Sequence, residues 1–200
     1  MEHRRKRLEL DVLRPWDVTV DASADHALKP FDNVDVRRCL IADKKVRGKR
    51  NNDGRRRRNN WPGKALADEI GGAFANVNVT NTDDIINATE MAKSMGPVRV
   101  LVNSAGIGWA QRTVGKDGTY ESAADLDAFK KVVAINLVGT FDCMRIAGTA
   151  MSRTEPMASG ERGAIVNLAS VAAFDGQIGQ AAYSASKGGV VGMTLPVARD

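Results

Sequence analysis

Residues 183–187, Tyr183-Ser184-Ala185-Ser186-Lys187, are the stretch from which the rest of the chain can be interpreted. Residues four apart lie on one face of a helix, so the phenol of Tyr183 and the ammonium of Lys187 can share a pocket. A free phenol titrates near ~10, and a fixed cation beside it favours the phenolate. The pair therefore predicts a tyrosine that acts as a general acid/base. An exposed Tyr and Lys on a helix would be the alternative.

Apolar runs upstream of this stretch predict buried parallel strands that end in polar residues. Residues 163–170 form one run and end at Ser170, and residues 98–102 form another, followed by Asn103. Open α/β sheets bind their ligands at the carboxyl ends of the strands. We therefore expect the hydroxyl of Ser170 to hold a substrate oxygen while Tyr183 transfers the proton.

Helices are predicted between these strands. Residues 83–95 follow Thr82, which is expected to cap that helix. Residues 127–150 have the pattern of one long amphipathic helix, and Asn136 lies inside it. An Asn in the middle of a helix is usually a polar residue with ordinary hydrogen-bond partners. Asn136 is singled out only because it occurs together with Ser170, Tyr183 and Lys187.

The motifs occur in the order and spacing of the short-chain dehydrogenase/reductase family, which the chain resembles from about residue 63 to residue 200. They are Asn103-Ser104-Ala105-Gly106, the helical Asn136, the strand-end Ser170 and the Tyr183/Lys187 pair. Within the family, residues 170–183 and 188–200 are most similar to type-2 3-hydroxyacyl-CoA dehydrogenases, also called type-10 17β-hydroxysteroid dehydrogenases. The resemblance implies an α/β fold with a doubly wound, Rossmann-like parallel sheet.

The resemblance also implies a reaction, which is reversible hydride transfer between a secondary alcohol or ketone and a nicotinamide cofactor. Tyr183 would be the acid/base, Ser170 would hold the substrate oxygen, Lys187 would bind the nicotinamide ribose, and Asn136 would hold a water in the proton path. The implied substrate is a 3-hydroxyacyl-CoA or a hydroxysteroid. Two further residues are expected to face the substrate cleft, Gln177 and Gln180. No metal site is expected.

The implied cofactor is NAD, with NADP as the alternative. The residues expected to contact it are Asp43, Asn78, Val79, Asn103, Ala105, Gly106, Tyr183 and Lys187. Asp43 ends a predicted strand over 39–43, where an acidic residue can accept hydrogen bonds from the ribose. An ordinary strand-end Asp is the other interpretation, and basic residues directly after it could hold a 2′-phosphate. Asn78 and Val79 end a predicted strand over 74–79.

Residues 1–62 depart from the family pattern and hold the basic excess. Residues 1–60 contain 17 Lys/Arg and 10 Asp/Glu, whereas residues 61–200 contain 12 and 14. The first forty residues should contain the first strand, a glycine-rich turn that binds pyrophosphate, and the first helix. No Gly precedes Gly48, and residues 18–26 match the outline of that turn only outside its glycine positions. The signal for pyrophosphate binding is absent.

Residues 44–62 hold nine Lys/Arg and one aliphatic residue, which predicts a disordered, solvated loop. A nucleic-acid patch and a retained intron are the alternatives for this loop. We expect residues 1–62 to be a divergent segment. Residues 63–200 should be the core of a single Rossmann-like domain that lacks the last strands of the family.

Three functions follow from these observations. The first is the dehydrogenase, the second is a catalytically impaired fragment or pseudoenzyme that cannot bind NAD, and the third is nucleic-acid binding through the basic loop. The two cysteines, Cys39 and Cys143, give neither a disulfide framework nor a metal spacing, which favours a reducing compartment. We therefore expect a cytoplasmic or mitochondrial protein that is not secreted. The family resemblance implies a homo-oligomer (dimer or tetramer) if the chain is complete, and no membrane partner is expected.

Overall fold

Strands and helices alternate along the residues that the computed structural model describes, which are 40–43 and 62–200. The degenerate turn predicted at 18–26 and nearly all of the basic loop lie outside the described residues. The elements, in chain order, are β1 Leu40–Asp43, α1 Pro62–Glu69, β2 Ala73–Asn76, α2 Thr82–Met95, β3 Val100–Asn103, η2 Tyr120–Ser122, α3 Leu126–Val133, η3 Ala134–Val138, α4 Gly139–Ser152, β4 Ala164–Asn167, η4 Val171–Ala173 and α5 Ala181–Arg199.

The strands form two parallel pairs. β1 pairs with β2, with Asp43 opposite Asn76, and β3 pairs with β4, with Asn103 opposite Asn167. In the doubly wound order 3-2-1-4-5-6, these pairs correspond to strands 3-2 and 4-5. The predicted α/β fold with a doubly wound parallel sheet is therefore confirmed. The residues predicted to form the first strand lie outside the described part of the chain.

The strands are shorter than the apolar runs that predicted them. β2 ends at Asn76 rather than at residue 79, and β4 ends at Asn167 rather than at residue 170. β3 begins at Val100 and includes Asn103, where residues 98–102 were predicted. Ser170 and Asn78 therefore lie in the segments that follow the strands. In both cases the apolar run continues past the last residue of the ladder, as Val77 after β2 and Leu168 after β4, so the length of the run does not mark the strand end.

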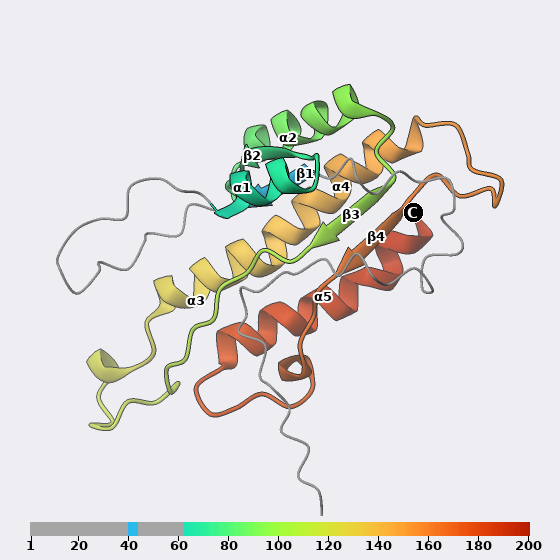
Figure 1. Ribbon diagram of the computed structural model, residues 1–200. Coiled ribbons are helices and arrows are strands. Elements are labelled where there is room, and N and C mark those ends of the chain that lie inside the picture. The colour runs from blue at the N-terminus through green and yellow to red at the C-terminus, as the bar shows by residue number, and fades with distance from the viewer. Residues whose placement is uncertain (1–39, 44–61) are drawn as a thin grey trace, which may run out of the picture. The chain divides into compact units, whose positions relative to one another are not determined.

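α3, η3 and α4 follow one another without a break and form one long helical rod (Figure 1). The predicted long helix over 127–150 is confirmed as one continuous helical segment, and its middle, η3, is a π-helix in which Gly139 N–H bonds to the carbonyl of Ala134. A π segment of one turn inside an α-helix is rare and often marks a functional site. Here it contains Asn136, whose side chain is completely buried.

Thr82, the predicted N-cap of α2, is instead its first residue, and the N-cap is Asn81. The side chain of Asn81, not that of Thr82, accepts the hydrogen bond from Asp83 N–H, at 2.9 Å. Asn and Thr are both good capping residues, so the sequence alone could not choose between neighbours. Thr82 instead donates its hydroxyl to the carboxylate of Asp142 on α4, at 2.7 Å. This hydrogen bond links α2 to the long helical rod.

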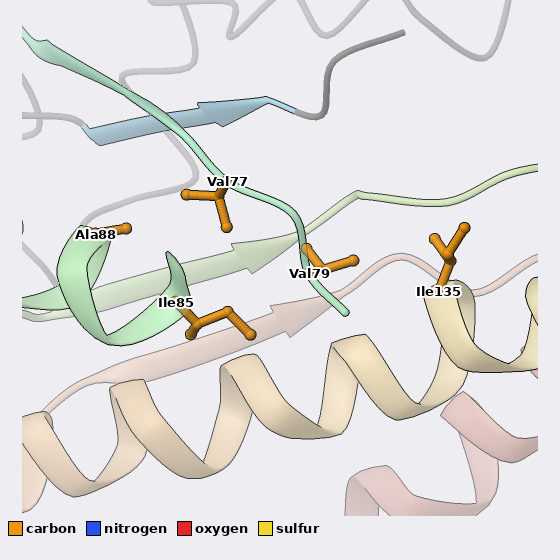
Figure 2. Close-up of a cluster of buried hydrophobic side chains, with 5 residues drawn as sticks. All are labelled: Val77, Val79, Ile85, Ala88 and Ile135. Carbon is orange, nitrogen blue, oxygen red and sulfur yellow. The ribbon is translucent and has the colours of Figure 1, made fainter. Parts of the chain in front are cut away.

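A cluster of buried side chains joins the β2–α2 region to η3 (Figure 2). Its members are Val77, Val79, Ile85, Ala88 and Ile135. The segment after β2 can approach the rod closely because the nearest residue there is a glycine. A Cβ on Gly139 would lie 2.8 Å from Val79 Cγ2 and from the carbonyl of Val79. Any larger residue at this position would therefore separate the two segments.

The β3–β4 pair is covered on one face by α4, which contributes the buried Met144, Ala147 and Met151. Its other face is largely exposed, and the side chains concerned are Val100, Val102, Val166 and Leu168. Length and composition alone would let the stretch Tyr120–Ser152 cross a membrane, a feature that the sequence analysis did not identify. The buried helix of a soluble α/β protein has the same composition, so this stretch is weak evidence of a membrane partner.

Candidate active site

Lys187 and Tyr183 lie one turn apart on α5, as their spacing predicts. The side chain of Lys187 is buried, with 7% of the residue exposed. Its Nζ donates to the carbonyl of Leu168, just beyond β4, at 2.6 Å, and lies 5.9 Å from the centre of the Tyr183 ring. No carboxylate among the described residues forms an ion pair with it, and burial lowers the pKa of Lys187 from its ordinary value of 10.5. The site therefore holds a desolvated amine beside a phenol.

Asn136 is fixed by three hydrogen bonds of its carboxamide. Oδ1 accepts from Ile107 N–H at 2.8 Å, and Nδ2 donates to Ile107 O at 2.9 Å and to Ser186 Oγ at 3.1 Å. Both hydrogens of the amide nitrogen are thus used, and neither can hold a water. The main-chain carbonyl of Asn136 accepts from the hydroxyl of Thr140, at 2.8 Å. Asn136 binds the loop after β3 to the helical rod.

Ser170 lies three residues past the end of β4 and caps the short helix η4. Its Oγ accepts a hydrogen bond from Ala172 N–H at 3.2 Å. A hydroxyl that accepts in this way still has its own hydrogen to donate, which suits the predicted contact with a substrate oxygen. Within the described part of the chain, no hydrogen bond joins Ser170 to Tyr183. Such contacts between catalytic groups often form only with substrate bound.

The polar residues that end β3 and β4 pair with each other. Asn103 Nδ2 donates to Asn167 Oδ1 at 2.9 Å, and Asn167 Nδ2 in turn lies 3.3 Å from Thr194 Oγ1 on α5. The side chain of Asn103 therefore faces the neighbouring strand. Its carbonyl accepts from Leu168 N–H at 3.0 Å. Sequence reasoning missed Asn167, although it is a polar residue inside an otherwise apolar run, and that was the available signal.

The loop after β3 leaves space in front of Lys187. Ala105 is exposed and Gly106 is half-buried. A Cβ on Gly106 would lie 3.3 Å from Asn136 Oδ1 and 3.9 Å from Lys187 Nζ. The absence of a side chain at this position keeps the approach to the amine open, so Gly106, Asn136 and Lys187 line one small region of the site.

The predicted cofactor residues near β1 and β2 are placed differently. Asp43 is the last residue of β1. The exposed side chain of Asn78 accepts from Thr80 N–H and Oγ1, at 3.3 and 2.9 Å. Val79 is buried against Gly139, so its side chain belongs to the core. A cofactor could reach only the main chain of Val79.

Gln177 and Gln180 form a local turn before α5. Gln180 Oε1 accepts from Gln177 N–H at 3.0 Å. A cavity of about 310 Å³ lies nearby, and the residues that line it include Trp109, Gln111, Leu126, Phe129, Gly179 and Ala182. Neither glutamine lines it, and neither do Ser170, Tyr183 or Lys187. The structure therefore does not bring the two predicted substrate residues to this cavity.

Cys143 on α4 is partly buried and packs against the cluster formed by Val77, Val79, Ile85, Ala88 and Ile135. Burial, together with the neighbouring charge of Asp142, raises the pKa of its thiol to about 11. A thiol with such a pKa is protonated at neutral pH and is a poor nucleophile. Cys143 is therefore a packing residue of this cluster.

Residues 55–200 match the family model described as short chain dehydrogenase. The chain belongs to this family. A human short-chain dehydrogenase, 3-hydroxyacyl-CoA dehydrogenase type-2, is 48% identical over 145 residues, which are 70% of this chain and 54% of that protein. The Drosophila melanogaster protein of the same name is 49% identical over 138 residues, 68% of this chain and 52% of the relative. The predicted family and the predicted resemblance to 3-hydroxyacyl-CoA dehydrogenase type-2 are thus confirmed.

A solved short-chain dehydrogenase structure agrees with the sequence comparison. The crystal structure of 3-hydroxyacyl-CoA dehydrogenase type-2 from Mycobacterium avium superposes with a TM-score of 0.67 at 40% identity, covering 80% of this chain and 58% of that one. The chain spans about half the length of the curated relatives it matches.

Short-chain dehydrogenases use NAD or NADP in general, and the residues around Lys187 fit the nicotinamide-ribose part of such a cofactor. A buried amine and a phenol hydroxyl can donate to ribose hydroxyls. The space that a Cβ on Gly106 would fill lets a ligand approach the loop after β3. The residues predicted to meet the pyrophosphate lie outside the described part of the chain.

Proposed function

We propose that this chain catalyses the reversible oxidation of a secondary alcohol to a ketone with a nicotinamide cofactor, and that its substrate is a 3-hydroxyacyl-CoA. One observation carries the proposal. It is the buried amine of Lys187, bound to the Leu168 carbonyl and 5.9 Å from the ring of Tyr183. The substrate class rests on the relatives named 3-hydroxyacyl-CoA dehydrogenase type-2. A hydroxysteroid is the alternative substrate.

The residues divide the chemistry between proton transfer and positioning. Tyr183 would take the proton of the substrate hydroxyl during oxidation and return it during reduction. Ser170 would donate its free hydroxyl hydrogen to the same substrate oxygen. In its protonated form, Lys187 would stabilise negative charge on the Tyr183 oxygen and donate to the ribose. The bound nicotinamide would supply the hydride acceptor or donor.

NAD is the cofactor that we propose, with NADP as the alternative. Asp43 ends β1, which is the strand position where an acidic residue accepts hydrogen bonds from the adenosine ribose. Asn103, Ala105 and Gly106 would form the floor beneath the nicotinamide half, and Asn78 with the main chain of Val79 would border the adenine. Asn136 would hold the loop after β3 in place through Ile107.

The test uses the full 200-residue chain with NAD and a short-chain 3-hydroxyacyl-CoA, and it measures NADH formation. The chain offers a matched pair of variants because it has only two tyrosines, Tyr120 and Tyr183. Tyr183→Phe removes the proton carrier and should lower kcat by at least ~10²-fold. Tyr120→Phe should leave kcat unchanged, because the side chain of Tyr120 is 97% exposed to solvent.

A titration of the chain with NAD precedes the kinetic measurement. Binding together with NADH formation that depends on Tyr183 would support the proposal. A chain that binds no NAD at millimolar concentration would contradict it and would favour the impaired fragment. Equal rates for the two tyrosine variants would also contradict it.

A further inference from the structure

Ser186 is a completely buried hydroxyl residue between Tyr183 and Lys187. Its Oγ donates to the main-chain carbonyl of Tyr183 at 2.7 Å and accepts from Asn136 Nδ2 at 3.1 Å. It therefore bonds to the residue proposed to transfer the proton and to the buried amide of η3. The bond to Tyr183 lies within α5, as is common for a helical serine. The bond to Asn136 joins α5 to a different helical segment, η3, and is the unusual one.

The close contact between α5 and η3 explains how a side chain as short as serine can reach Asn136. A Cβ on Gly189 would lie 2.7 Å from Leu137 Cδ2, so a larger residue at this position would have to displace the Leu137 side chain. Gly189 lies three residues after Ser186, on the same side of α5. Leu137 follows Asn136 directly in the π segment. The packing and the hydrogen bond therefore reinforce each other.

The hydrogen bonds form a continuous chain from the loop after β3 to the first turn of α5. Ile107 bonds to both ends of the Asn136 carboxamide, Asn136 bonds to Ser186, and Ser186 bonds to Tyr183. Every hydrogen in this chain has an acceptor. Loss of the Ser186 hydroxyl would leave one N–H of Asn136 buried without a partner, and the carboxamide would no longer be held in one orientation.

We propose that Ser186 is a positioning residue, which fixes the Tyr183 turn of α5 against Asn136 and thereby against the loop after β3. The inference rests on the proposed function, since it assigns Ser186 to the geometry of the same proton transfer. Ser186 itself touches neither substrate nor cofactor in this proposal. It acts on the position of Tyr183 and, through Asn136, on that of Ile107.

The test compares Ser186→Ala with Ser184→Ala in the full chain. Ser184 lies on the same turn of α5, is half-buried and has no hydrogen bond from its hydroxyl to another described residue, so it controls for removing a hydroxyl from this helix. The first measurement is hydrogen exchange of the Ile107 amide, which bonds to Asn136 Oδ1. Ser186→Ala should speed this exchange about tenfold, whereas Ser184→Ala should leave it unchanged.

The second measurement separates kcat from KM for NAD and for a short-chain 3-hydroxyacyl-CoA. A displaced proton carrier slows the chemical step more than it weakens binding. Ser186→Ala should lower kcat about tenfold or more, while both KM values stay within about twofold of the parent chain. Ser184→Ala should change neither quantity.

The outcomes distinguish this inference from the proposed function. Unchanged exchange at Ile107 in Ser186→Ala would overturn the inference, whether or not the chain is active. Faster exchange with an unchanged kcat in an active chain would also overturn it, because Ser186 would then be merely structural. If the parent chain has no activity, the proposed function fails, and faster exchange in Ser186→Ala alone would still support the positioning of this turn.

Discussion

The carboxyl ends of the two strand pairs are held by different kinds of hydrogen bond. Around the end of β3–β4, side chains join residues that lie far apart in the sequence: Lys187 to Leu168, Asn136 to Ile107 and Ser186, and Asn103 to Asn167. After β2, the hydrogen bonds of Asn78 and Asn81, which include one from Asn78 N–H to the carboxylate of Asp84, stay within six positions and build a turn before α2. The first end depends on the packing of several elements, and the second is a local structure.

This difference matters for function because proton transfer tolerates little displacement of the reacting groups. The residues proposed for the chemistry all lie at the end that long-range contacts hold. The end that would border the adenine is attached to the rest of the chain by the apolar cluster of Figure 2 and by the bond between Thr82 and Asp142. We expect substitutions at the two ends to differ in the size of their effects.

The largest effect is expected at the amine. Lys187→Met removes the charge beside Tyr183 and the donor to the ribose, and should lower kcat by about 10³-fold. Lys131→Met is the matched control, since Lys131 is an exposed lysine on α3. Steady-state NADH formation measures both variants. Similar rates for the two would show that the buried amine has no part in the reaction.

The second effect compares one asparagine at each end. Asn136→Ala removes the hydrogen-bond partner of Ile107 N–H, of the Ile107 carbonyl and of the Ser186 hydroxyl. The free energy of unfolding should therefore fall by about 3 kcal/mol. Asn78→Ala removes only exposed bonds to Thr80 and should cost less than about 1 kcal/mol. Urea unfolding followed by circular dichroism gives both values. Equal losses would contradict the distinction between a long-range and a local end.

A smaller effect is expected at the bond that joins the two regions. Thr82→Val keeps the shape of the side chain but removes the donor to Asp142, at 2.7 Å. The free energy of unfolding should fall by roughly 1–2 kcal/mol, because the acceptor is charged and Asp142 is largely buried. The kcat should not change. A loss of activity without a loss of stability would mean that this bond serves the site rather than the fold.

The smallest effect is a pH dependence of stability. Burial lowers the pKa of Lys187 in the folded chain below the 10.5 of the unfolded chain, so the unfolded state binds the proton more tightly. The free-energy cost of burying the charged amine is fully present below the pKa of the folded chain, and it disappears as the pH rises toward 10.5. The free energy of unfolding of the parent chain, relative to Lys187→Met, should therefore increase with pH in that window. A constant difference across the window would contradict this.

The sequence was sufficient for the parallel α/β arrangement, because apolar runs and helix spacing determine which segments are buried. It also placed Tyr183 and Lys187 on one helix face, which the structure shows. It could not give the strand ends, since Leu168 continues the apolar run of β4 as part of the following segment. It also missed the hydrogen bond between Ser186 and Asn136, which depends on how closely α5 crosses η3. The predicted roles of Asp43 and of residues 18–26 remain predictions.

The π segment at Ala134–Val138 has a consequence for how the long helical rod can change. Such a turn is equivalent to an α-helix that has gained one residue, and each residue of an α-helix turns the chain by about 100°. The π turn takes up that residue by widening, so α3 before it and α4 after it keep the faces that an unbroken α-helix would give them. Deleting one residue from α4 itself, where no widened turn absorbs the change, would rotate the remainder by about 100° and move Met144, Ala147 and Met151 off the buried face.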